Sequence, residues 1–263
     1  MAEVPAHGAL PVRTTAREVV GGFMARLRHL PQVALTPFLV LFLVQGGLML
    51  LRGGGGDDGQ SSPLAAIAVL AAIPVVVFAY AAFLVDWLRL VLLGPEQAGT
   101  GPRLSVGGRD ARMLASGILV AVLALLASIP GIVLGMLAGG SPVAGVVAAL
   151  VTLLLALTAA VSFGLVLPAV AVDRSLGMGA AWSAARPVLV KIAGIVALTL
   201  LPVHLLVSSS GVAYAVMLSG DGPVVPVMVL TLVLEFVELA LLGSLLAALH
   251  QRLLGDPTRA EAA

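Results

Sequence analysis

The sequence predicts an all-α polytopic membrane protein with six transmembrane helices arranged as three antiparallel hairpins, plus two short cytoplasmic interfacial helices. The 263-residue chain is 60% apolar and 10% charged, whereas soluble domains are typically about 45–50% apolar and about 25% charged. The apolar residues gather in six segments, each long enough to cross a hydrocarbon core about 30 Å thick as a helix of about 20 residues. These segments lie at roughly 33–51, 64–85, 113–137, 143–170, 192–218 and 224–249.

The basic residues predict how the chain is threaded through the membrane. Thirteen of the fourteen Lys and Arg residues fall in the N-terminal arm, in alternate loops and in the C-terminal tail, which leaves Arg52 alone on the other side. Lys and Arg in short loops remain on the cytoplasmic side of a membrane. We therefore expect both termini in the cytoplasm. The preference for Arg over Lys, with abundant Ala, Gly and Val, indicates a bacterial protein, located in the cytoplasmic (inner) membrane.

The chain divides into a cytoplasmic arm (1–30), a six-span membrane domain (31–255) and a short cytoplasmic tail (256–263). Within the arm, residues 15–30 predict an amphipathic helix lying in the headgroup plane, because one face is apolar and the others carry charge. That apolar face comprises Val19, Val20, Phe23, Leu27 and Leu30. A second interfacial helix is expected over 175–187, where Trp182 suits the membrane interface.

Three similar segments mark the cytoplasmic ends of the second, fourth and sixth spans: DWLRLVLLG (86–94), DRSLG (173–177) and HQRLLG (250–255). Each places an arginine close to the negative end of a helix dipole and ends in a glycine that suits a left-handed helix cap. A duplicated hairpin would explain the repeat, and so would the general requirements of a membrane exit. The residues expected at this boundary are Arg89, Arg174, Arg252 and Trp182.

The third span carries a stripe of small residues spaced four apart: Ala127, Gly131, Gly135 and Gly139. Such a stripe lets a second helix backbone approach closely. The partner is expected to be another helix of the same bundle, and a second copy of the chain is the alternative.

Ionisable residues within the last two spans predict a polar site inside the membrane. Such residues are rare at this depth and face a bundle interior or a wet cavity. Glu235 and Glu238 share a face of the sixth span, and His204 lies at the depth of Glu238 if the two spans are antiparallel neighbours. We expect His204 to lie within reach of Glu235 or Glu238. Nearby hydroxyls complete the candidate site, namely Thr231 and Ser208.

This polar site has three interpretations. The first is a structural tie between helices, the second a relay for protons or cations, and the third a contact with a substrate headgroup. A tie predicts paired, dry carboxyl groups, whereas transport predicts that both line a polar cavity shared with other spans.

Sequence motifs of enzymes are missing from the chain. It has no cysteine, which excludes disulfides and thiolate chemistry. No zinc-ligand spacing, phosphate-binding loop or nucleophile elbow occurs. We therefore expect no catalytic residue, no metal, no cofactor and no nucleic-acid partner.

Two blocks resemble a family of small bacterial inner-membrane proteins. AFLVDWLRLVLLGPE (82–96), followed by the basic GGRDARMLAS (107–116), is similar to the family's second-span exit, and VLPAVAVDRSLGMGAAWSAAR (166–186) is similar to its Leu-Pro-Ala exit and Ala-Trp helix. The family includes YciC-like proteins and the membrane domain attached to some glycerophosphodiester phosphodiesterases. The resemblance implies a six-helix membrane fold and carries over no catalytic residue.

Together these observations predict a non-enzymatic membrane protein with an envelope- or lipid-associated role, in contact with anionic headgroups. The main alternative is a small transporter or channel that uses the His204 and Glu cluster. An intramembrane enzyme is a third class, and it requires a nucleophile or metal ligands at one depth.

Overall fold

The computed structural model describes residues 10–53, 63–98, 107–137, 141–218 and 223–255, and every regular element in those ranges is helical. Six helical stretches are long and apolar enough to cross a membrane, in agreement with the six predicted segments. They are Val12–Leu51, Ala66–Leu93, Gly108–Leu137, Pro142–Ala171, Met178–Leu218 and Val224–Leu254. The described part of the chain is therefore all-helical, and it has six helices that can span a membrane.

The described helices follow one another with short breaks. In chain order they are α1 (Val12–Arg26), η1 (Leu27–His29), α2 (Leu30–Gly53), α3 (Pro63–Leu93), α4 (Pro95–Ala98), α5 (Gly108–Leu137), α6 (Pro142–Gly164), α7 (Val166–Ala171), α8 (Met178–Ala185), η2 (Arg186–Val188), α9 (Leu189–Leu218) and α10 (Val224–Leu254). The elements η1 and η2 are single turns of 3₁₀ helix that join α1 to α2 and α8 to α9.

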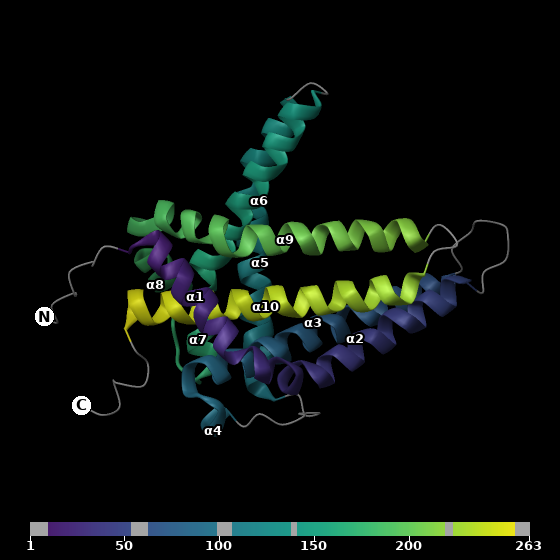
Figure 1. Ribbon diagram of the computed structural model, residues 1–263, viewed down its shortest axis with the longest axis horizontal. Helices are drawn as coiled ribbons and strands as arrows, with labels where there is room; N and C mark the ends of the chain where they lie inside the picture. Colours follow the sequence, from purple (N-terminus) through teal and green to yellow (C-terminus); the bar gives the residue numbers. More distant parts are fainter. Residues whose placement is uncertain (1–9, 54–62, 99–106, 138–140, 219–222, 256–263) are drawn as a thin grey trace, which may run out of the picture.

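Four long helices set the main axis of the molecule. Figure 1 shows α2, α3, α9 and α10 extended along the long axis, with α1 crossing α10 near the end where α10 stops. Three pairs of long helices that follow each other in the chain pack side by side: α2 with α3, α5 with α6, and α9 with α10. The α5–α6 pair points away from the main axis, so its far part has few neighbours beyond its own two helices.

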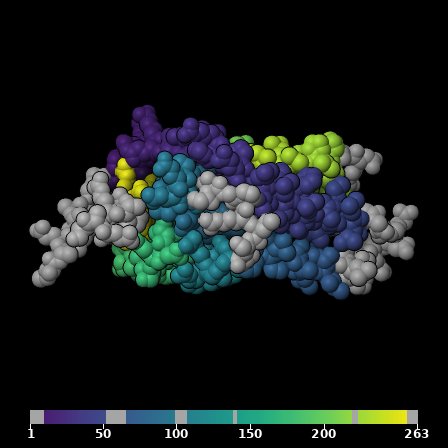
Figure 2. All heavy atoms as spheres, turned by 90° about the horizontal axis from the view of Figure 1, so that it is seen from below, coloured from purple at the N-terminus to yellow at the C-terminus, as the bar shows by residue number. Residues whose placement is uncertain are grey.

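Burial divides the bundle into two parts. We call the packed half the region where α1 and α7 meet Ala79–Leu92 of α3, Ile192–Leu200 of α9 and Phe236–His250 of α10, because most of the buried side chains lie there. The open half comprises the remaining parts of α2, α3, α9 and α10 together with the far part of α5–α6. Many of its large apolar side chains are exposed, although Leu41, Met228 and Leu232 are buried. Figure 2 shows α1 and α2 forming one continuous surface along both halves.

The helix ends at the packed half differ from the prediction at one of three places. Gly94 and Gly255 have φ values of 81° and 89°, as expected for glycines that end α3 and α10. At the third exit the left-handed residue is Asp173, with φ 59°, and Gly177 instead precedes α8 with φ −75°. Aspartate tolerates this conformation better than most residues because its short side chain can bond locally.

The predicted fourth span, 143–170, is broken into α6 and α7. Helix α6 ends at Gly164, and α7 contains Pro168, which has no N–H for the carbonyl four residues earlier. At the break, Nδ1 of His250 donates to the carbonyl oxygen of Leu165 at 2.9 Å. This bond from α10 satisfies a carbonyl group that lies inside the packed half.

Helix α1 packs on protein through the face that carries Thr15, Ala16, Val19 and Phe23, all buried. It contacts α9 and α10, and the ring of Phe23 lies 6.1 Å from that of Trp87. The sequence placed Val20 and Leu27 on the same apolar face, yet both are exposed. The buried face is therefore rotated away from Val20 and Leu27, and it places Phe23 against Trp87.

The small-residue stripe of α5 lies against α6. A Cβ atom on Gly131 would lie 2.2 Å from Oγ1 and 2.6 Å from Cα of Thr152, whereas one on Gly135 would lie 3.6 Å from Cβ of Ala148. Ala127 is half-buried, and Gly139 lies outside the described residues. The close approach at Gly131 shows that this part of the stripe serves packing within the chain.

Candidate functional site

The predicted contact between the last two spans is present. Nδ1 of His204, on α9, lies 2.7 Å from Oε1 of Glu238, on α10. The two helices are neighbours, so equal distances along the chain from their connecting turn place the two side chains at one depth. The His204 side chain is 31% exposed and that of Glu238 is 18% exposed, so the pair lies near the edge of the interface between helices.

The second carboxyl group has a partner that the sequence analysis missed. The hydroxyl of Tyr80, on α3, donates a hydrogen bond to Oε2 of Glu235. The chain has only two tyrosines, and a tyrosine hydroxyl inside an apolar span requires an acceptor. The presence of a tyrosine within an apolar span therefore indicates from the sequence that an acceptor lies nearby, but it does not indicate which helix supplies that acceptor.

Aromatic packing holds Tyr80 in place. The Phe236 ring lies 5.9 Å from the ring of Tyr80 and 4.8 Å from the ring of Phe83, the latter in an edge-on arrangement. Phe83 also stacks with Trp87. These rings join α3 to α10 beside Glu235, so the position of the Tyr80 hydroxyl follows from the packing around Phe236.

Two predicted members do not take part in this site. The hydroxyl of Thr231 is buried and donates to the carbonyl of Val227 in its own helix at 2.9 Å. Ser208 is exposed. The intramembrane polar site therefore consists of His204, Glu238, Glu235 and Tyr80, and its two bonds link α10 to α9 and to α3.

The predicted boundary residues gather at the packed half. Nη1 of Arg89 donates to the carbonyl of Ala171 at 3.3 Å, and the ring of Trp182 stacks on that of Phe163 at 5.0 Å. The backbone N–H of Arg174 donates to the carbonyl of Ala169 at 2.8 Å. The contact made by Arg89 joins the two sequence blocks that carry the family resemblance.

Asp173 interacts with two arginines of α5 at the same end of the packed half. It forms ion pairs with Arg109 and, at 2.7 Å, with Arg112. The hydrogen bond from Arg109 is the main reason that the pKa of Asp173 lies below its ordinary value, and Arg112 adds to the effect. The left-handed turn at Asp173 is thus also an electrostatic link between α7 and the start of α5.

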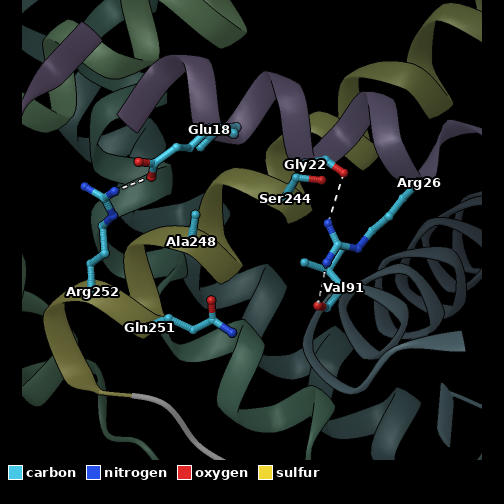
Figure 3. A pocket seen from close by; sticks show the side chains of 9 residues that line it. Glu18, Gly22, Arg26, Val91, Ser244, Ala248, Gln251 and Arg252 are labelled. Atoms are coloured by element: carbon cyan, nitrogen blue, oxygen red, sulfur yellow. Dashed lines mark hydrogen bonds and ion pairs between the residues drawn. The ribbon is translucent and has the colours of Figure 1, made fainter. Parts of the chain in front are cut away.

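A polar cavity lies between α1, α10 and the end of α3. Its volume is about 330 Å³, and it is lined by Glu18, Val19, Gly22, Arg26, Val91, Ser244, Ala248, Gln251 and Arg252. Figure 3 shows the two arginines at opposite sides of this space, with the amide of Gln251 between them. The sequence analysis did not predict this cavity, because the crossing of α1 over α10 brings its walls together.

The two arginines of the cavity have different partners. Arg252 forms an ion pair with Glu18 and donates to Oγ1 of Thr15 at 2.8 Å. Arg26 donates to two backbone carbonyls, those of Gly22 at 3.0 Å and Val91 at 3.5 Å. One positive charge of the lining is therefore balanced by a carboxylate, and the other is held by neutral acceptors.

Within the described part of the chain, no group of three or more His, Asp or Glu side chains could hold a metal ion. Comparison of the whole chain with known protein families, with curated proteins and with solved structures gives no match.

Proposed function

We propose that the protein is a non-enzymatic, multi-pass protein of the bacterial cytoplasmic membrane with a lipid-associated role in the cell envelope. The exposed surface of the open half supports membrane insertion. Leu43, Leu50 and Leu70 are 70%, 79% and 67% exposed. Such apolar surface is unfavourable in water and is accommodated by lipid chains.

We further propose that both termini are cytoplasmic, that the six spans form three antiparallel hairpins, and that α1 and α8 lie at the headgroup level. Thirteen of the fourteen basic residues would then lie on the cytoplasmic side. Reporter fusions test this orientation. An alkaline phosphatase fused after Ala263 should be inactive, one fused near Gly56 should be active, and the reverse pattern would reject the proposed threading.

The proposed role of the intramembrane carboxyl groups is to tie helices together. The observation that carries this proposal is that each has a partner on a different helix, His204 for Glu238 and Tyr80 for Glu235. An unpartnered ionisable group is costly at this depth, and the two bonds join α10 to α9 and to α3. Paired carboxyl groups favour a tie over an open polar path.

Proton-coupled transport is the second candidate function. It is favoured by the partial exposure of His204 and Glu238, because a histidine and a carboxylate in contact can exchange a proton. This candidate requires both groups to change protonation during the transport cycle.

One experiment separates the two candidates. The purified chain is reconstituted into liposomes that contain a pH-sensitive dye, and proton flux is recorded after a pH step for wild type, the Glu235→Gln, Glu238→Gln double variant and protein-free liposomes. A tie predicts that all three give equal flux. It also predicts that Glu238→Leu, which cannot bond to His204, lowers the melting temperature in detergent more than Glu238→Gln does. Flux that is present in wild type and lost in the double variant would overturn the tie and establish transport.

A further inference from the structure

Arg26 presents an unneutralised positive charge to the cavity between α1, α3 and α10. It donates hydrogen bonds to two carbonyl oxygens, which carry no net charge, and among the described residues no carboxylate pairs with it. The cavity also contains Arg252 and Glu18, which neutralise each other. Its lining therefore carries one surplus positive charge.

Donors that remain available face this space from two helices. A guanidinium group has five N–H donors in a planar fork, and the two carbonyl contacts of Arg26 occupy one donor on each terminal nitrogen. Gln251, on α10, is exposed, and its amide lies between the two arginines (Figure 3). A charged donor and a neutral donor thus line the same cavity.

The size of the cavity suits a small anionic group. Its volume of about 330 Å³ lies at the lower end of the range of about 300–1,000 Å³ that is usual for small-molecule sites. Phosphate oxygens are strong acceptors for arginine, and the charge-assisted bonds they form are about twice as strong as neutral ones.

The position of the cavity indicates where such a group would come from. It lies at the end of the molecule where α10 stops, which is the headgroup level of the cytoplasmic leaflet in the proposed orientation. Met24, on the face of α1 turned away from the cavity lining, is 57% exposed, so α1 also offers an apolar side chain at this level. A phospholipid has both parts, a phosphate ester and an apolar chain.

We propose that this cavity binds a phosphate ester anion through Arg26 and Gln251, and that a phospholipid headgroup supplies it. The inference rests on the membrane orientation proposed above and assigns the lipid-associated role to named residues. Arg26 supplies the charge, Gln251 supplies a neutral donor, and Glu18 limits the site to one net positive charge by holding Arg252.

Binding to the full-length chain in detergent tests this site with three probes. They are dihexanoyl phosphatidylglycerol, dihexanoylglycerol as the same molecule without phosphate, and inorganic phosphate, each titrated by calorimetry. Arg26→Gln removes the charge and keeps an amide donor for the carbonyls. The matched control is Arg17→Gln, an equal charge change at an exposed position of α1 outside the cavity.

Wild type should bind the phosphatidylglycerol probe and not dihexanoylglycerol. Arg26→Gln should weaken the binding about tenfold or more, as expected for the loss of a charged hydrogen bond, while Arg17→Gln binds as wild type does. Gln251→Leu, at an exposed position, should weaken binding by a smaller factor, and it decides the matter if Arg26→Gln does not fold.

Equal binding by wild type and by both cavity variants would overturn the site, and so would an equal loss in Arg17→Gln and Arg26→Gln. Binding of inorganic phosphate without the lipid probe would retain the anion site and reject a lipid as its source. These outcomes do not depend on proton flux. A chain that lacks phosphate binding yet shows the expected fusion pattern would reject this inference and leave the proposed function in place.

Discussion

The two halves of α10 have similar apolar composition and different surroundings. In Val224–Glu235 the side chains of Val225, Leu230 and Val233 are exposed while Met228 and Leu232 are buried, whereas in Phe236–His250 no large apolar side chain is exposed. The difference arises from small residues. Ala240, Gly243, Ser244 and Ala247 occur only in the second half, and they let α1 and α3 approach closely.

This comparison shows that hydropathy does not report burial in a membrane protein. Lipid chains are as apolar as a leucine side chain, so hydrophobicity alone does not draw one helix to another. In the packed half, close fit and hydrogen bonds hold the helices together, as Trp87 shows by filling the space beside Gly243 and donating to Oγ of Ser244 at 3.1 Å. In the open half the same kinds of side chain face outward.

The largest expected effect distinguishes the two halves by truncation of a side chain. Trp87→Ala should lower the free energy of unfolding by about 3–5 kcal/mol, because a large aromatic side chain with no exposed surface leaves a cavity. Leu205→Ala, on the open half of α9, should cost about 1 kcal/mol or less, because Leu205 is 43% exposed. Chemical unfolding in mixed micelles measures both values. Similar losses would mean that the halves are equally packed.

A second test adds one methyl group in each half. A Cβ atom on Gly243 would lie 2.8 Å from Cδ1 of Trp87 and 3.2 Å from Cδ1 of Leu84, whereas one on Gly211 would meet nothing within 4 Å. Gly243→Ala should destabilise the fold by about 1–3 kcal/mol through overpacking. Gly211→Ala should be neutral or stabilise by up to about 1 kcal/mol, because alanine favours the helix. Thermal unfolding in detergent checks the signs, and a stabilising Gly243→Ala would show that Trp87 can move.

The smallest expected effect concerns the charged rim of the packed half. Arg109 and Arg112 hold the pKa of Asp173 below its ordinary value of 3.8. A lowered folded-state pKa contributes stability above the unfolded pKa, and that contribution is lost as the pH falls through the folded-state value. The Asp173 side chain is 42% exposed, so solvent reduces the contribution to about 1 kcal/mol or less.

Asp173→Asn isolates this charge, because asparagine also tolerates the left-handed backbone at φ 59°. The variant should be slightly less stable than wild type at pH 7, and the difference should vanish as the pH is lowered below 3.8. Melting temperatures measured across that range check the prediction. A difference that persists in acid would indicate that the turn, and not the charge, depends on Asp173.

Part of the candidate site could be predicted from the sequence. The common depth of His204 and Glu238 follows from the sequence, because two helices joined by a short turn are neighbours and both residues are equally far from that turn. Depth does not fix the direction in which a side chain points, so the contact itself depends on how the two helices are rotated. The Tyr80–Glu235 bond joins α3 to α10, which are far apart in the chain, and depth does not tell which helices are neighbours. The cavity around Arg26 depends on the angle at which α1 crosses α10, and the spacing of apolar residues in the sequence does not predict that angle.

The sequence alone determined the six apolar helices and the uneven distribution of arginine. Helix length and hydropathy are local properties of the chain, and they decide whether a segment can cross a bilayer. The tertiary structure decided which faces are buried, the left-handed turn at Asp173, the break at Leu165 and the second partner of the carboxyl pair. These features depend on close contact between distant segments. In a chain that is apolar on every side, shape and a few hydrogen bonds select those contacts.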